Sequence, residues 1–184
     1  MKNATLGLGF GLTLALGTAA AMAQDMPMPF GSDADAEYAQ LLWEAMTASK
    51  LAGPGMIRHT PYEGTDPHGM MLETFYTSAT INGHTGDLIV KRNFGPEGVS
   101  ADAVLADPDK HLGAYTVMFR REAGYDPEDK DWFWVKFLPD GSLDKMPNGM
   151  PMAGQIAKGM GEGCIACHQG GGEDLVFTSD YLKY

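Results

Sequence analysis

Cysteine is scarce in this sequence, and so is positive charge. Its 184 residues include only 2 Cys, and 13 Lys and Arg stand against 24 Asp and Glu, which gives a formal net charge of -11. Two Cys are too few for a disulfide framework or a four-cysteine zinc site. The shortage of Lys and Arg argues against binding to nucleic acid or anionic membrane surfaces, because such binding depends on those side chains. A hydrophobic content of 44% excludes a disordered chain.

The start of the chain has the features of an export signal. Lys2 precedes an apolar stretch over residues 6–20, which ends in Ala21-Met22-Ala23. A basic start, an apolar centre and an Ala-x-Ala exit are typical of a secretory signal peptide. Cleavage after Ala23 would leave 161 residues with a net charge of -12, because Lys2 is lost. We expect a periplasmic protein with no membrane segment after cleavage. The alternative, an uncleaved anchor, fits the Gly- and Thr-rich stretch less well.

The mature chain changes from a helical pattern to a strand pattern. Ser32 as N-cap and apolar residues at helical spacing predict a helix that ends near Lys50. Pro and Gly residues make 57–69 a loop, and one short helix is expected within Val99–Asp109. Alternating residues and the turn signals Asn82-Gly83 and Asp140-Gly141 predict an antiparallel sheet. Its expected strands are Met70–Thr77, Asp87–Phe94, Gly113–Arg121 and Trp132–Leu138.

Both cysteines lie in one motif, Cys164-Ile165-Ala166-Cys167-His168. This is the C-x-x-C-H pattern of covalent haem attachment. Two thiols three positions apart on one helical turn can reach the two vinyl groups of one porphyrin. His168 can then bring an imidazole nitrogen under the iron. The motif predicts one haem c per chain, attached through a short helix near the C-terminus.

Three other interpretations of the motif fit less well. A thioredoxin-like redox pair normally follows a strand early in a βαβ unit, whereas this pair lies late in an antiparallel pattern. A zinc site needs two further ligands, and the remaining histidines are scattered singly. A plain disulfide between Cys164 and Cys167 would not explain the histidine that follows them, His168. The remaining histidines are His59, His68, His84 and His111.

The position of the motif narrows the class of haem protein. Class I cytochromes c take an axial Met from far downstream, and no Met follows Cys167. The four-helix cytochromes c′ should be helical throughout, but Leu88–Lys91 and Trp132–Phe137 have the composition of strands. The chain instead resembles the cytochrome P460 family, which includes cytochrome c′-beta, over roughly His68 to Thr178. The matching segments are Pro67-His68-Gly69, Leu88–Phe94, Tyr125-Asp126-Pro127, Asp131–Trp134, Gly163–His168 and Asp174–Thr178.

The residue pattern and the resemblance together predict an α+β fold, predominantly antiparallel sheet, in which the pattern gives the N-terminal helix and the motif gives the short haem-attachment helix. The resemblance implies a homodimer in which His168 binds the iron on one side and the other side is open. The expected organisation is a signal peptide at 1–23, a leader, helix and loop at 24–66, and the haem domain at 67–184. P460-type members oxidise hydroxylamine, while relatives without a lysine–porphyrin bond bind nitric oxide or similar small ligands.

Several residues are candidates for positions around the iron, and one of them comes from the resemblance. Lys91 matches the lysine that bonds to the porphyrin edge in cross-linked members, and it shares a strand face with Ile89. Glu73 is a candidate base if it is buried beside the iron. Phe75 and Phe94 are candidates for an apolar cap over the open face. The plainer alternatives are that Lys91 is an exposed strand lysine, that Glu73 is solvated, and that Phe75 and Phe94 belong to the ordinary sheet core.

At two positions the sequence differs from the family pattern, and both differences bear on which reaction the protein could catalyse. Glu73 stands where an arginine is expected, and no acidic residue lies on Tyr115–Phe119 where the family has one. The expected function is therefore redox chemistry or binding of small nitrogen species at an open haem, with a periplasmic electron acceptor. The alternative is an electron carrier whose haem is closed by a sixth ligand. Met146, Met150, Met152 and Met160 precede the motif, and a Met that reached the open face would close it, although packing is their plainer role. His68, which opens a strand after Pro67, is expected to be structural rather than a second iron ligand.

Overall fold

The structure is a computed structural model that describes Met1 and residues 28–177. The expected signal peptide, apart from Met1, lies outside the described residues, and so does Thr178. Among the described residues, no helix has both the length and the apolar character that crossing a membrane requires.

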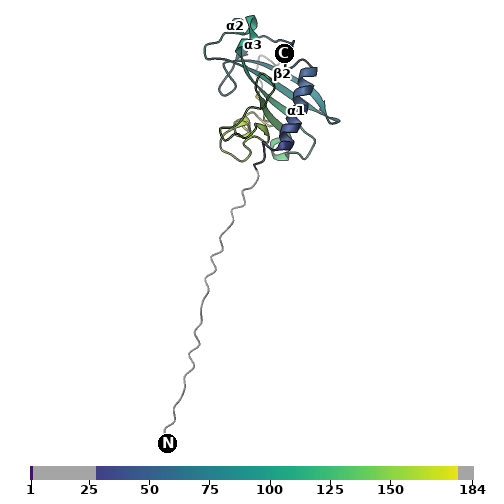
Figure 1. Cartoon of the computed structure of the whole chain (residues 1–184), viewed down its shortest axis with the longest axis vertical. Coiled ribbons are helices and arrows are strands. Elements are labelled where there is room, and N and C mark those ends of the chain that lie inside the picture. The colour runs from purple at the N-terminus through teal and green to yellow at the C-terminus, as the bar shows by residue number, and fades with distance from the viewer. Residues whose placement is uncertain (2–27, 178–184) are drawn as a thin grey trace.

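A single antiparallel sheet organises the chain, which confirms the mixed α+β class (Figure 1). Its strands follow one another in sequence order, so every neighbouring pair is joined by a local connection. The strands are β1 (Tyr62–Glu63), β2 (Met71–Ile81), β3 (His84–Phe94), β4 (Leu112–Arg120), β5 (Trp132–Phe137) and β6 (Ala153–Gly154). The helices are α1 (Asp33–Ala48), α2 (Ala101–Ala106), α3 (Pro108–His111), the 3-10 helix η1 (Pro127–Asp129) and α4 (Cys164–His168).

The β2–β3 hairpin is longer than the sequence pattern predicts. Asn82 and Gly83 form the predicted turn, with φ of 50° and 83°, as a two-residue hairpin requires. The strands continue to this turn through residues 78–81 and 84–86. Four of these seven residues are polar, namely Ser78, Thr80, His84 and Thr85, so the hydrophobic pattern fades before the backbone pairing ends, although Ile81 and Gly86 are buried.

Other differences are small elements. The single helix expected within Val99–Asp109 is two short helices, α2 and α3, because Pro108 cannot continue the first and begins the second. The two-residue strands β1 and β6 at the sheet edges were not predicted. Two residues are too few to show a period.

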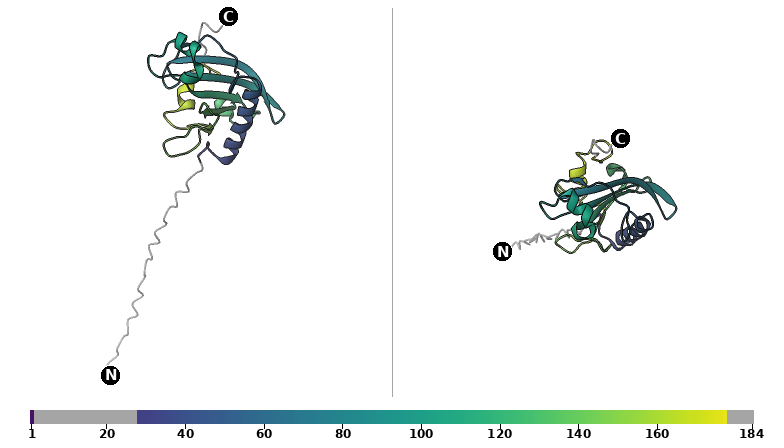
Figure 2. Two further views of the ribbon diagram at one scale, coloured as in Figure 1. Left: turned by 45° about the horizontal axis from the view of Figure 1, so that its top comes forward. Right: turned by 90° about the horizontal axis from the view of Figure 1, so that it is seen from above.

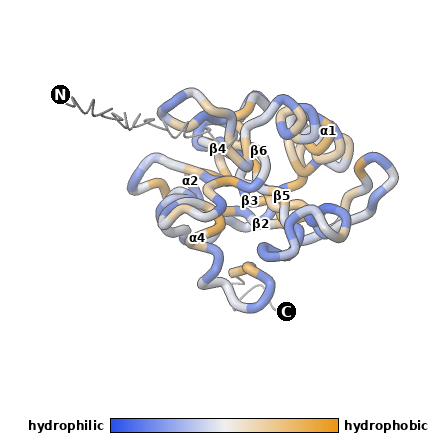
Figure 3. Tube along the Cα trace, turned by 90° about the horizontal axis from the view of Figure 1, so that it is seen from below, coloured by the Kyte–Doolittle hydropathy of each residue, from blue (hydrophilic) through white to orange (hydrophobic). Residues whose placement is uncertain are grey.

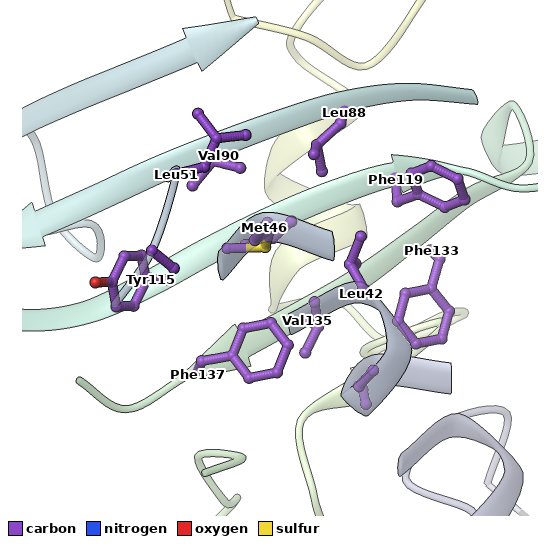
Figure 4. Packing of buried hydrophobic residues seen from close by; sticks show 14 of the residues in the cluster. Leu42, Met46, Leu51, Leu88, Val90, Tyr115, Phe119, Phe133, Val135 and Phe137 are labelled. Carbon is purple, nitrogen blue, oxygen red and sulfur yellow. The ribbon is translucent and has the colours of Figure 1, made fainter. Parts of the chain in front are cut away.

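Helix α1 covers one face of the sheet. Ser32 caps it, since the Ser32 hydroxyl accepts from Asp35 N and the Asp35 carboxylate accepts from Ser32 N at 3.1 Å each. Leu42 and Met46 on α1 are fully buried against the sheet (Figure 4). The sheet residues labelled in that core are Leu88, Val90, Tyr115, Phe119, Phe133, Val135 and Phe137.

The opposite face of the sheet carries the C-terminal segment. Figures 2 and 3 show α1 and α4 on opposite sides of the strands. Because side chains alternate along a strand, Val90 faces the α1 core while Ile89 packs in a second cluster with Ile165 of α4. The same alternation on β5 sends Val135 to one side and Trp134 to the other. The sheet therefore separates a closed apolar core from the face that holds the cysteine motif.

Candidate functional site

The cysteine motif opens onto a cavity of about 520 Å³ between the sheet and α4. Cys164, Cys167 and His168 all line it, and so does Lys91 from β3. His68, from the loop before β2, lines it as well. Residues more than seventy positions apart in the sequence thus share one cavity. The wall also includes Tyr76, Ile89, Thr116, Met118, Trp134, Lys136, Met152 and Phe177.

The short helix α4 presents both thiols to this cavity. Gly163 precedes it with φ of 122°, a conformation that L side chains rarely adopt. The Cys167 amide then donates to the Gly163 carbonyl at 3.0 Å, which closes the first turn. Both thiols are free, and burial raises the pKa of the Cys164 thiol, so this sulfur is held protonated. Two unbridged thiols on one turn match the spacing needed for two thioether bonds.

His168 is buried and held in one tautomer. Its Nδ1 lies 2.7 Å from the Leu175 carbonyl oxygen, which can only accept, so Nδ1 carries the hydrogen. Nε2 therefore keeps the lone pair that a metal ion would bind. The ring packs against Trp134 and Phe177, with ring centroids 4.8 Å and 5.4 Å away. Burial also lowers the pKa of His168, which favours the neutral, ligating form.

Lys91 lies on the cavity face of β3, opposite Thr116 of β4. No hydrogen bond or ion pair to its amine is found among the described residues. Burial lowers the pKa of this amine, because the charged form loses hydration without gaining a carboxylate partner. An unpaired, partly desolvated amine is more nucleophilic than a surface lysine.

His68 faces the same cavity from the loop before β2. Its Nδ1 lies 3.1 Å from the Thr116 hydroxyl, which also contacts the Asn93 amide. Nε2 has no partner among the described residues, and the ring lies 6.0 Å from the His168 ring. Burial, followed by the nearby Lys91 charge, lowers the pKa of His68 to about 3. His68 is therefore neutral at neutral pH.

Glu73 does not line the cavity. It is fully buried, as the base hypothesis required, but it lies on the α1 side of the sheet, opposite Arg92 of β3. Its carboxylate accepts from Arg92 Nη1 at 2.8 Å and from Arg58 Nη2 at 2.6 Å. Two guanidinium partners stabilise the ionised form, so a structural ion-pair role replaces the predicted role of a base beside the iron.

Phe75 and Phe94 do not cap the cavity either. Phe75 shares the face of its neighbour Val90 in the α1 core, and the Arg92 guanidinium lies 4.5 Å from its ring centroid. Phe94 is buried with Val104 of α2 in a separate cluster, after an irregularity in the β3–β4 register. The plainer interpretation of both rings as sheet core is the one that fits.

Sequence reasoning overlooked several residues of the cavity wall. Trp134 is buried in the second apolar cluster and also packs against His168, and its buried indole Nε1–H has no partner among the described residues. Alternation along β5 places Trp134 and Lys136 on one face, a signal that was available in the sequence. Met118 on β4 and Met152 also line the wall, whereas Met146 and Met150 pack beside the second cluster.

These residues fit a covalent haem. The cavity offers two free thiols, an imidazole with an available Nε2 and a buried indole donor that finds no partner in the part of the chain that the structure describes. Lys91 adds positive charge in an acidic chain, which suits a group that carries carboxylates. Among the described residues, no group of three or more His, Cys, Asp or Glu is arranged to hold a metal ion by itself.

Comparison with known proteins gives no further guide. The chain matches no model of a known protein family, no curated protein and no solved structure.

Proposed function

We propose that this chain is an exported, periplasmic cytochrome with one covalent haem c, related to the cytochrome P460 family. The observation that carries the proposal is the meeting of Cys164, Cys167, His168 and Lys91 in one cavity. A haem bound there would supply a coordination site for a small ligand and one-electron redox chemistry. The expected partners are a periplasmic electron acceptor and a second copy of the chain.

The protein's own groups support binding of that haem. Cys164 and Cys167 provide the covalent anchor, and His168 provides an axial nitrogen whose tautomer is fixed by Leu175. The side chains of Ile89 and Trp134 add apolar surface to the cavity wall. Such a site suits small uncharged nitrogen species such as nitric oxide or hydroxylamine.

The first test is whether haem is attached. The protein should be expressed in a bacterium with c-type haem maturation, denatured, and examined for haem absorbance that stays with the chain. Wild type should retain one haem per chain, and Cys164→Ser/Cys167→Ser should retain none. Haem-free wild-type protein under these conditions would contradict the proposal.

The second test concerns Lys91. A bond from its amine to the porphyrin edge would red-shift the Soret band of the ferrous protein, and Lys91→Ala should abolish that shift. Lys136→Ala is the matched control. Lys136 lines the same cavity, but its amine is paired with the Asp144 carboxylate at 2.8 Å. An unshifted wild-type spectrum would place the protein with the relatives that lack the bond.

The third test separates an enzyme from a binding protein. Purified protein should be mixed with hydroxylamine and an artificial electron acceptor, and in parallel titrated with nitric oxide. Turnover above that of free haem c supports an oxidoreductase. Binding of nitric oxide without turnover supports a scavenging or sensing protein. The placement of Glu73 away from the cavity removes the one base that was expected for hydroxylamine oxidation.

A second candidate function is an electron carrier with a closed haem. His68 favours it, because its Nε2 is unpartnered and its ring lies 6.0 Å from the His168 ring. Two imidazoles bound to opposite sides of one metal at about 2 Å place their ring centres about 6 Å apart. A low-spin spectrum that ignores added ligands, and becomes ligand-sensitive in His68→Ala but not in His59→Ala, would support this candidate.

A further inference from the structure

The segment that follows α4 is fastened to the sheet at Asp174, and a second hydrogen bond runs from the Tyr76 hydroxyl of β2 to the Phe177 carbonyl at 3.3 Å. Both carboxylate oxygens of Asp174 accept from Arg120 Nη2 at 2.8 Å, and its main-chain oxygen accepts from the Trp132 indole at 3.0 Å. Arg120 ends β4 and Trp132 begins β5, and the two are paired across the ladder. We call Arg120, Trp132 and Asp174 the Asp174 anchor.

The two sheet residues of the Asp174 anchor, Arg120 and Trp132, are held in place by further contacts. The Arg120 guanidinium lies 4.0 Å from the Trp132 ring centroid. It also donates to the Lys130 carbonyl at 2.7 Å and to the Asp87 carboxylate at 3.1 Å. An isolated surface ion pair contributes little, but a stacked guanidinium with several acceptors has only one favourable geometry. Arg120 therefore holds Asp174 at a defined place.

The next residue, Leu175, makes the contact with the haem ligand. Its carbonyl accepts from His168 Nδ1 at 2.7 Å. Leu175 has φ of 58°, a left-handed conformation that is uncommon for leucine and persists only where the surroundings fix it. The attachment of Asp174, immediately before it, and the burial of the Leu175 side chain in the second cluster provide that fixation. Figure 2 shows this C-terminal stretch on the side of the sheet away from α1.

We propose that Arg120 and Trp132, acting through Asp174, hold the Leu175 carbonyl against His168 and thereby set how strongly His168 Nε2 binds iron. This inference rests on the proposed haem function. An imidazole that donates from Nδ1 to a fixed acceptor is a stronger electron donor at Nε2, and it cannot rotate. None of the three anchor residues touches His168, so they are positioning residues.

The test compares two carboxylates that share Arg120. Asp174→Asn and Asp87→Asn each replace one carboxylate partner of this arginine by a neutral amide, and both side chains are largely exposed, at 59% and 66%. Only Asp174 belongs to the segment that carries Leu175. The readouts on the haem-loaded protein are the iron–histidine stretching frequency of the ferrous form, by resonance Raman spectroscopy, and the midpoint potential.

Asp174→Asn should lower the stretching frequency and raise the midpoint potential, because a loosened carbonyl makes His168 a weaker donor. A tenfold change in the ferrous-to-ferric ratio corresponds to about 59 mV. Asp87→Asn should leave the stretching frequency unchanged, and Asp174→Glu should restore much of the wild-type value. An unchanged frequency in Asp174→Asn, or an equal fall in Asp87→Asn, would overturn the inference.

Failure of the haem proposal is recognised separately. If purified wild type carries no haem, the proposed function fails, and the anchor is then judged by NMR on the same protein. Exchange of the His168 Nδ1 proton with solvent should be faster in Asp174→Asn than in wild type or Asp87→Asn. Equal exchange in all three proteins would overturn the anchor as well.

Discussion

At the scale of single residues, the neighbours Lys91 and Arg92 on β3 have different roles because they face opposite sides of the sheet. Lys91 points toward the cavity, where its amine has no partner among the described residues, and Arg92 points to the other face. There Arg92 is fully buried, bonded to Glu73 and to the carbonyl of Leu51 in the loop after α1. The cation facing the cavity is left available for chemistry, whereas the cation on the α1 side stabilises the fold.

Replacement of Glu73 tests this division. Glu73→Gln leaves Arg92 and Arg58 without a counter-charge, and breaking a buried pair costs about 3–5 kcal/mol of unfolding free energy. The haem absorption spectrum should not change, because Glu73 lies outside the cavity. Chemical denaturation and absorption spectroscopy measure both effects, with the exposed Glu63→Gln as control. A changed spectrum without loss of stability would restore Glu73 as a residue of the haem site.

His68 makes stability depend on pH. Its pKa is about 3 in the fold against 6.5 ordinarily, so the unfolded chain takes up a proton first as pH falls. Stability should therefore fall between pH 6.5 and pH 3, and this residue accounts for up to about 3 kcal/mol of the loss at pH 4. In the haem-free Cys164→Ser/Cys167→Ser chain, His68→Gln should flatten that slope in denaturation curves measured from pH 7 to pH 4. The exposed His59→Gln should leave it unchanged.

At the scale of elements, α4 depends on its surroundings. A five-residue helix is not stable alone in water. It is held by the turn at Gly163, by the buried Ile165 and by the bond from His168 to Leu175. The spacing of the cysteines is a property of the motif, but the direction in which the thiols point is set by these three attachments.

Substitution of Gly163 should therefore prevent efficient haem attachment. A Cβ at this position would collide with the Ala157 side chain, and the φ of 122° is strained for any L residue. Gly163→Ala should destabilise the fold by about 1–3 kcal/mol and lower the fraction of chains that carry haem. Gly161→Ala is the matched control, because a Cβ there meets nothing within 4 Å. Intact mass gives the haem-loaded fraction, and equal loading of both variants would contradict the prediction.

At the scale of the whole molecule, the sheet divides the protein into two compartments. On one side α1 closes an apolar core, in which Leu42 and Met46 are fully buried. On the other side the second apolar cluster does not fill the space between the strands and α4, and the cavity lies there. The sheet is closely packed on its α1 face and borders a cavity on its other face. It therefore offers a rigid wall against which a large planar group can lie.

Export and haem attachment should be visible together in the mass of the mature protein. The periplasmic form should begin at Gln24, with 161 residues and one covalent haem. Its net charge of -12 from side chains should make it migrate as a strongly acidic protein. Intact mass spectrometry of a periplasmic extract checks both statements. A chain that retains residues 1–23 would favour the membrane-anchor alternative.

The sequence by itself determined the mixed fold class, the four long strands, the Asn82-Gly83 turn and the motif Cys164–His168. Each of these depends on local periodicity, turn chemistry or spacing, which neighbouring residues fix. Only the tertiary structure decided which long-range neighbours meet. It brought Lys91 and His68 to the motif, sent Glu73 and Phe75 to the opposite face, and placed Leu175 against His168. A shift of one residue in strand register moves a side chain to the opposite face of the sheet. Deciding which residues face the cavity therefore requires the register and the packing.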